Sequence, residues 1–221
     1  MNNILVIMKH YCAKWLVFTD LDGTLLDRRY DLKAAADAMD SLHQNECLCV
    51  PASSKTHVEM EELNSFRKFP SPYIFENGGG LSWPSATAPE MIGRSAEEIS
   101  DLLDHIRDEH RLNFRLFRDI SVVEIAGRTG LTEPGARKAK ARQASMPLIW
   151  SDTQESLERF RQILGFIGLQ VVGGGLFQTV LDRRCSKAAA MLSIAEQFNR
   201  GEHRPQLVAC GDAENDLDMM T

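Results

Sequence analysis

Two aspartates end an apolar stretch near the start of the chain, in VFTDLDGTLL at residues 17–26. Asp20 and Asp22 are one residue apart, and like charges this close at the end of a buried strand repel each other and lose hydration. A bound cation would remove that cost. A second acidic stretch, GDAEND at 211–216, also follows an apolar run. Oxygen-only sites without histidine suit Mg²⁺. The candidate ligands are Asp20, Asp22, Asp212 and Asp216.

Hydroxyl, amide and ammonium groups end the other apolar runs. These candidates are Ser53, Ser54 and Lys55 after CLCVP, Glu76, Asn77 and Gly78 after PYIF, and Lys187 at the start of a helical pattern. In parallel α/β sheets, ligands bind at the carboxyl ends of the strands. Hydroxyls and lysines suit a phosphate bound opposite a metal. A carboxylate facing such a phosphate can attack phosphorus and form an acyl phosphate.

Strand-like and helix-like patterns alternate in the first third of the chain, which is typical of an α/β protein. The predicted order is strand, helix, strand, helix, strand over 15–20, 30–44, 47–54, 57–69 and 72–80. This order predicts right-handed crossovers and a parallel sheet. The pattern resumes with a helix over 186–201 and a buried strand over 206–212.

The block between these two parts predicts an inserted α+β module. It begins with a turn-rich stretch that contains two prolines, and a helix over 95–110 follows, with Ser95 and Glu98 as a capping box. The rest predicts short strands and helices, including a helix capped by Thr132. The predicted division is a core domain at 1–82 and 182–221 with an inserted domain at 83–181.

Composition excludes several classes of protein. The 221 residues are 43% hydrophobic, which is enough for a substantial core, and the net charge of -6 argues against a nucleic-acid binder. No apolar run reaches the roughly 20 residues of a membrane helix. Five cysteines without a C-x-x-C pair predict a reduced, cytoplasmic protein. The N-terminal stretch is interpreted as a tail rather than a secretion signal. The basic run RKAKAR at 137–142 predicts a solvated helix face or, alternatively, attraction of an anionic substrate.

The motifs together resemble a known superfamily. DLDGT, SSK, Lys187 and GDAEND, in this order, resemble the four motifs of the haloacid dehalogenase-like (HAD) phosphatases, and the insertion resembles the large cap of subclass IIB. VFTDLDGTLLD, SSKTHVEMEEL, IFENGGG, ARQASMPLIWSD and GDAENDLDMM are similar to the mannosyl-3-phosphoglycerate phosphatase family. The resemblance covers 15–221. It implies a Rossmannoid parallel-sheet core with an inserted C2B-type cap, and Mg²⁺ as the cofactor.

The resemblance also implies catalytic roles. Asp20 would be the nucleophile that becomes phosphorylated, and Asp22 the general acid and then the base. Lys187 would neutralise charge between the phosphate and Asp20. Mg²⁺ would bind Asp20, the backbone carbonyl of Asp22 and Asp212, with Asp216 supporting the site directly or through water.

Further residues would contact the substrate. Ser53 would donate a hydrogen bond to the phosphoryl group, Asn77, Gly78 and Lys55 would face the substrate beneath the cap, and Asn215 would position the last loop. The implied partner is a small phosphorylated sugar-glycerate, with no nucleic acid and no membrane.

The substrate stays open between several candidates. Leu176 and Gln178 stand where the mannosyl-3-phosphoglycerate phosphatases commonly carry Arg and His, and SMP replaces their SEP at 145–147. The alternatives are another sugar-phosphate phosphatase, for glucosyl-3-phosphoglycerate or sucrose phosphate, and a truncated, non-catalytic binding protein. The end at Thr221, shortly after the fourth motif, predicts an uncovered sheet edge.

Overall fold

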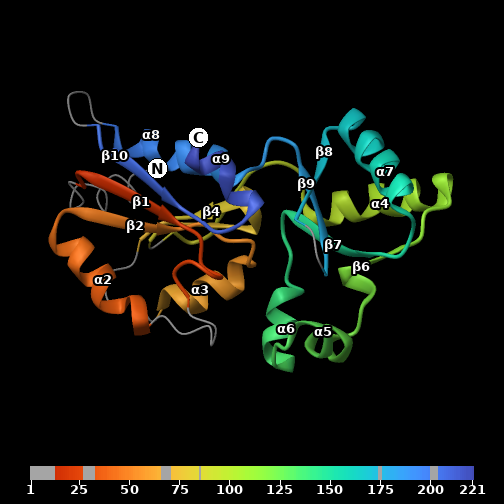
Figure 1. Ribbon diagram of the computed structural model, residues 1–221, viewed down its shortest axis with the longest axis horizontal. Helices are drawn as coiled ribbons and strands as arrows, with labels where there is room; N and C mark the ends of the chain where they lie inside the picture. The colour runs from red at the N-terminus through yellow and green to blue at the C-terminus, as the bar shows by residue number, and fades with distance from the viewer. Residues whose placement is uncertain (1–12, 27–32, 66–70, 85, 174–175, 200–203) are drawn as a thin grey trace.

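The computed structural model of the chain describes residues 13–26, 33–65, 71–84, 86–173, 176–199 and 204–221. Most of the predicted N-terminal tail therefore lies outside the described residues. Two lobes are visible in Figure 1, one holding both ends of the described chain and the other built from the middle of the sequence. No helix among the described residues is long and apolar enough to cross a membrane.

A parallel sheet forms the centre of the first lobe. Its strand order is β10 (Gln206–Cys210), β1 (Trp15–Thr19), β2 (Cys47–Pro51). Leu16 and Phe18 of the central strand are fully buried, which explains the apolar run before Asp20. The parallel order brings the residues that follow β1 and β10 to one edge of the sheet, as the α/β pattern predicts.

Helices cover both faces of this sheet (Figure 1). On one face lie α2 (Lys33–Gln44) and α3 (His57–Ser65), and on the other lie α8 (Lys187–Phe198) and the short α9 (Leu217–Met220). Buried side chains of α8, including Ala190 and Ile194, pack against the sheet. This layered arrangement confirms the predicted α/β class.

The third predicted strand only partly joins the parallel sheet. β3 (Tyr73–Phe75) meets the β2 side through a single bridge between Ala52 and Ile74. Its ladder partner is antiparallel β4 (Gly80–Ser82), which pairs in turn with β5 (Glu90–Met91). The turn-rich stretch therefore also contributes strands, which its prolines and turn residues do not indicate. Gly80 lies so close to the Phe75 ring that a Cβ would overlap it, so glycine permits this tight reversal.

The last strand is more exposed than its sequence predicts. QLVACGD indicates a buried strand, yet Leu207 and Val208 of β10 are 40% and 36% exposed. β10 pairs only with β1 and so forms the edge of the described sheet. An edge strand has one side without a neighbour, which the apolar pattern alone does not reveal.

The second lobe has its own antiparallel sheet and its own buried cluster. The strand order is β6 (Phe114–Leu116), β7 (Ser145–Trp150), β9 (Gln178–Asp182), β8 (Leu169–Val172). Its helices are α4 (Ala96–His110), α5 (Val122–Thr129), α6 (Glu133–Ala139) and α7 (Gln154–Phe166). The capping box of Ser95 and Glu98 forms as predicted, and Thr132 caps α6. This lobe is the inserted cap. The proposed boundaries at 82/83 and 181/182 stay a prediction.

Two chain segments that connect the lobes pack against each other. Gly93 follows β5 in a left-handed conformation with φ of 87°, while Asp182 ends β9 and Cys185 follows it. A Cβ on Gly93 would lie 2.5 Å from the Asp182 Cβ and 2.8 Å from the Cys185 Sγ. Glycine therefore permits both the backbone conformation and the close approach of the two connections.

This contact gives a test of the connection. Gly93→Ala should lower the free energy of unfolding by about 2–4 kcal/mol, because a side chain there meets a strained backbone and two packed neighbours. Urea unfolding followed by circular dichroism measures the change.

Gly127→Ala is the matched control. Gly127 lies on exposed α5 with no atom within 4 Å of a Cβ, so alanine should stabilise the protein by about 0.5–1 kcal/mol. Equal unfolding midpoints for the two variants would contradict the packing described at Gly93.

Candidate active site

Three carboxylates converge at the edge of the parallel sheet. Asp20 follows β1, while Asp212 and Asp216 follow β10, and one oxygen from each lies within 4.8 Å of the others. Asp20 and Asp216 are buried, whereas Asp212 is exposed. The donor set contains oxygen only, which fits Mg²⁺. The structure thus brings together three of the four acidic residues predicted to form a metal site.

A buried lysine lies between two of these carboxylates. Nζ of Lys187 is 2.5 Å from Oδ1 of Asp20 and 2.7 Å from Oδ1 of Asp216. Lys187 is 1% exposed, so its charge depends on these two partners. It is the first residue of α8, whose N-cap Ser186 accepts a hydrogen bond from the Ala189 amide.

Burial controls the ionisation of Asp20. The loss of hydration raises the pKa of the Asp20 carboxyl, and the neighbouring Lys187 acts in the opposite direction. Asp216 adds a like charge that also raises this pKa. A cation bound beside Asp20 would favour its ionised form, as nucleophilic attack requires.

Asp216 shapes the loop that carries Asp212. Its Oδ2 accepts hydrogen bonds from the amides of Asp212, at 3.2 Å, and Ala213, at 3.1 Å, while its Oδ1 accepts from Lys187. Both oxygens of Asp216 therefore have donors in the protein. This geometry favours Asp20 and Asp212 as direct metal ligands, with Asp216 as their support.

The carboxylate of Asp22 is directed elsewhere. Its Oδ2 is 2.7 Å from Nζ of Lys55, and among the described residues no hydrogen-bond partner reaches its buried Oδ1. The sequence predicted that Asp22 and Lys55 both lie at the site, but it did not predict the ion pair between them. Asp22 lines the cleft, so its carboxyl group could exchange a proton with a bound substrate.

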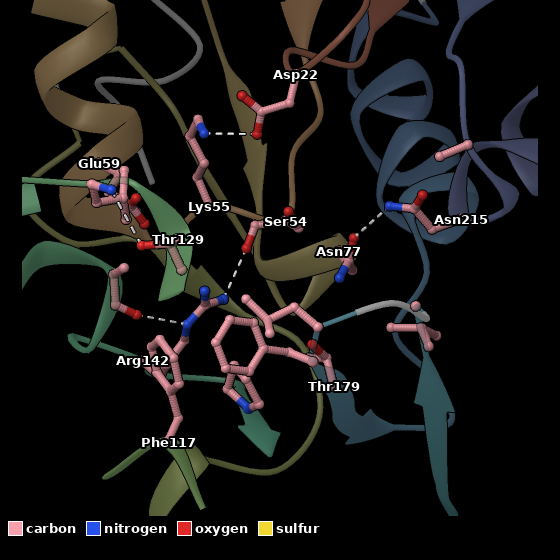
Figure 2. Close-up of a pocket in the computed structure, with 18 of the residues that line it drawn as sticks. Asp22, Ser54, Lys55, Glu59, Asn77, Phe117, Thr129, Arg142, Thr179 and Asn215 are labelled. Carbon is pink, nitrogen blue, oxygen red and sulfur yellow. Dashed lines mark hydrogen bonds and ion pairs between the residues drawn. The ribbon is translucent and has the colours of Figure 1, made fainter. Parts of the chain in front are cut away.

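A cleft of about 460 Å³ lies between the two lobes. Its first-lobe side is polar and includes Asp22, Ser54, Lys55 and Asn77, as Figure 2 shows. On the cap side, Phe117 and Phe177 meet edge to face, with ring centroids 5.1 Å apart. The apolar cap residues Leu131, Pro147 and Leu176 also line it, together with the hydroxyls of Thr129 and Thr179. The cleft therefore offers one polar wall and one mostly apolar wall.

The predicted substrate residues separate into two groups. Asn77, Lys55 and Asn215 line the cleft, and Asn215 Nδ2 donates to Asn77 Oδ1 at 3.0 Å. Ser53 is fully buried, accepts from the Lys55 amide at 3.2 Å and does not line the cleft. Gly78 has a φ of 87° and packs against the backbone of Ser186 rather than lining the cleft.

The basic run at 137–142 contacts the rest of the protein more than a solvated helix face would. α6 ends at Ala139, so the last part of the run is not helical. Lys138 pairs with Glu62 of α3, and Lys140 Nζ donates to the Ile120 carbonyl at 2.6 Å. Arg142 lines the cleft, and its Nη1 donates to the Ser54 carbonyl at 2.8 Å. The expectation of a solvated face is wrong at Lys140 and Arg142, whereas Lys138 makes its ion pair at the surface.

Glu76 was among the candidates at the strand ends, but the sequence assigned it no individual role. It is fully buried, and its carboxylate accepts hydrogen bonds from the Gln143 amide, the Ala144 amide and the Ser145 hydroxyl of the cap. A polar residue at the end of an apolar strand is its only sequence signal. The partners lie 67 to 69 residues away, so local pattern could not reveal them.

Comparisons with known proteins agree with this geometry. The family model of the haloacid dehalogenase-like hydrolases matches residues 17–221. A phosphatase of the HAD superfamily from Bacteroides thetaiotaomicron has a similar structure, with a TM-score of 0.70 and 18% identity over 94% of this chain and 81% of that one. A protein of Thermoplasma acidophilum gives 0.68 and 19%, over 94% and 80%. A protein of Thermotoga maritima gives 0.65 and 21%, over 94% and 82%. At these identities the likeness shows the fold.

Because Asp20 and Asp216 share the Lys187 ammonium group, we predict a large loss of stability in Lys187→Met. This change leaves two buried carboxylates without their cation, so the free energy of unfolding at neutral pH should fall by about 3–5 kcal/mol. Urea unfolding of metal-free protein measures it.

Lys138→Met is the control, since Lys138 pairs with Glu62 at the surface. An exposed ion pair contributes about 0–1 kcal/mol, so this variant should stay close to the parent protein. Similar losses in both variants would argue against a special role of the buried ammonium.

Proposed function

The chain belongs to the haloacid dehalogenase-like hydrolase family, and we propose that it hydrolyses phosphate monoesters with Mg²⁺, through phosphorylation of Asp20. One observation carries the proposal: Asp20, Asp212 and Asp216 share an oxygen-only site with a buried Lys187, next to a cleft. A bound Mg²⁺ would offset the negative charge of the three carboxylates, and together with the Lys187 ammonium group it would favour a phosphoryl group over an uncharged substrate. The Bacteroides neighbour, described as a phosphatase, supports the same reaction.

The proposed reaction has two steps. In the first, Asp20 attacks phosphorus, the bond between phosphorus and the leaving oxygen breaks, and Asp22 gives that oxygen a proton. In the second, Asp22 takes a proton from water, the water oxygen attacks phosphorus, and inorganic phosphate leaves Asp20. We assign the proton transfer to the carboxyl group of Asp22, which lines the cleft.

Charge stabilisation comes from groups fixed before the substrate binds. Lys187 is held between Asp20 and Asp216 and would face the transferred phosphoryl group as negative charge moves to the leaving oxygen. Mg²⁺, when bound by Asp20, Asp212 and the Asp22 carbonyl, supplies further positive charge to the phosphoryl oxygens. Ser53 stays a proposed hydrogen-bond donor to that group.

For the substrate we propose mannosyl-3-phosphoglycerate. The resemblance of SSKT and PLIWSD to the family of that name supports this choice, as do two cations in the cleft, Lys55 and Arg142, that could bind the glycerate carboxylate. Thr129 and Thr179 offer hydroxyls to a sugar, and the Phe117 ring offers a flat apolar face. Glucosyl-3-phosphoglycerate and sucrose phosphate are the alternative substrates.

Asp20→Asn tests the reaction. The variant should lose phosphate release from p-nitrophenyl phosphate by at least about a thousandfold, because an amide cannot attack phosphorus. Chelation of Mg²⁺ should abolish the activity of the parent protein. The variant should still fold: burial raises the Asp20 pKa, so the ionised form costs folding free energy at neutral pH that Asn does not.

Asp218→Asn is the matched control. Asp218 is exposed on α9 near the same loop, and its carboxylate is not part of the acidic group. The control should retain parental activity. A well-folded parent protein that releases no phosphate from any substrate would favour the non-catalytic alternative.

The substrate assignment has its own test. The kcat/KM for mannosyl-3-phosphoglycerate should exceed that for glucosyl-3-phosphoglycerate and sucrose phosphate by about tenfold or more, since a hydroxyl of wrong orientation leaves a polar group unpaired. Phosphate release under identical Mg²⁺ concentrations measures the ratios. Equal values across the three esters would contradict the assignment and leave the general phosphatase activity intact.

A further inference from the structure

A buried carboxylate joins the two lobes where they meet. Glu76 Oε1 accepts from the Gln143 amide at 2.8 Å, and Oε2 accepts from the Ala144 amide at 3.0 Å and the Ser145 hydroxyl at 2.6 Å. Glu76 is 0% exposed. All three partners are donors, so both carboxylate oxygens are satisfied without a cation from the cap. Hydrogen bonds to an ionised group are among the stronger contacts available to a protein.

The backbone at Glu76 is unusual. Glu76, Asn77 and Gly78 have φ values of 49°, 55° and 87°, three left-handed residues in succession. Non-glycine residues pay a free-energy cost in this region, and such a turn persists only where its surroundings fix it. Here the Glu76 amide donates to the Lys55 carbonyl at 2.8 Å, and the Asn77 amide to the Ser53 carbonyl at 3.0 Å.

Each residue of this turn contacts a different part of the protein. Glu76 binds the cap at the start of β7, and Asn77 accepts from Asn215 of the fourth-motif loop. Gly78 packs against the backbone of Ser186, directly before Lys187. A single turn therefore connects the orientation of the cap to the loop that carries Asp212 and to the helix that carries Lys187.

The clamped cap segment also forms part of the cleft wall. Arg142 directly precedes it and Pro147 closely follows it, and both line the cleft. Ser145 pairs with Leu181 in the sheet register, next to the connection that returns the chain to the first lobe. The Glu76 contact therefore lies beside the connection about which the cap would turn. A small displacement at this contact would produce a larger change in the separation of the cleft walls.

We infer that Glu76 is a positioning residue that sets the cap against the catalytic edge and thereby determines selection of the leaving group. It touches neither the proposed metal ligands nor the cleft. The inference rests on the proposed function. Under that function the first lobe holds the phosphoryl group and the cap contacts the leaving group. Loss of Glu76 should therefore weaken binding of a large leaving group and spare a small one.

The experiment compares Glu76→Gln with the parent protein on two substrates. Glutamine keeps the size but places an amide NH₂ among three donors, so at least one contact is lost. The KM for mannosyl-3-phosphoglycerate should rise about tenfold, whereas kcat/KM for acetyl phosphate, whose small leaving group cannot span the cleft, should stay within about twofold. Loss of a residue needed only for stability would affect the kinetic constants for both substrates equally.

A second readout needs no turnover. Amide hydrogen exchange at Gln143 and Ala144 should accelerate about tenfold or more in Glu76→Gln, because these are the amides that the carboxylate holds. Ser145→Ala removes one donor and leaves two, so it should shift both readouts in the same direction by a smaller amount. This milder variant decides the question if Glu76→Gln does not fold.

Glu62→Gln is the matched control, a carboxylate that also reaches the cap, through Lys138, but at the surface. It should leave both substrates and both amides unchanged. Equal losses on the two substrates, or no change on either, would overturn the inference. If the parent protein hydrolyses acetyl phosphate but not mannosyl-3-phosphoglycerate, the proposed substrate fails. The exchange data then decide alone whether Glu76 holds the cap, and unaltered exchange in folded Glu76→Gln refutes it.

Discussion

The contact of Lys187 with Asp20 and Asp216 is the constraint on which the site depends. A buried ammonium group keeps its charge only beside fixed acceptors, and two buried carboxylates avoid repulsion only beside a fixed donor. Each of the three must therefore be held in place by its own element. β1 and β10 are neighbours in the sheet, and α8 begins at Lys187 with Ser186 as its cap. The parallel order of the strands is what makes these distant residues meet.

Close packing around this contact explains the glycines of the motifs. Gly23 lies against the Asp212 carboxylate and Gly211 against Asp216, so a Cβ at either position would overlap an acidic side chain. This dense packing holds the buried Asp20, Asp216 and Lys187 close to one another, while Asp212 stays exposed. The cap contributes none of the three carboxylates. It supplies the mostly apolar wall of the cleft, so under the proposed function the cap would contact the leaving group while the first lobe would carry the reacting groups.

Residues could be predicted from the sequence where the interactions that explain them involve neighbours in the chain. Acidic pairs at the ends of apolar runs indicated Asp20 and Asp212, and caps such as Ser95 with Glu98 need partners only three residues apart. Prediction failed where the partner is distant. Nothing near Glu76 or Arg142 indicates contacts with Ser145 or Ser54. β10 reads as buried because apolar residues do not tell an edge strand from a central one. β4 was missed because a hairpin closed by glycines looks like a loop.

The overall charge of the chain makes local cations decisive for an anionic ligand. With a net charge of -6, the protein repels a phosphate ester at long range, but salt screens this repulsion beyond about 8–10 Å. Inside the cleft, Lys55 and Arg142 lie within that distance of a bound ligand, together with the acidic residues Asp22, Glu59 and Glu214. Lys55 is already paired with Asp22, so it offsets a carboxylate that would otherwise oppose the substrate. Arg142 donates to a neutral carbonyl rather than a carboxylate, so its charge remains available to attract an anion into the cleft.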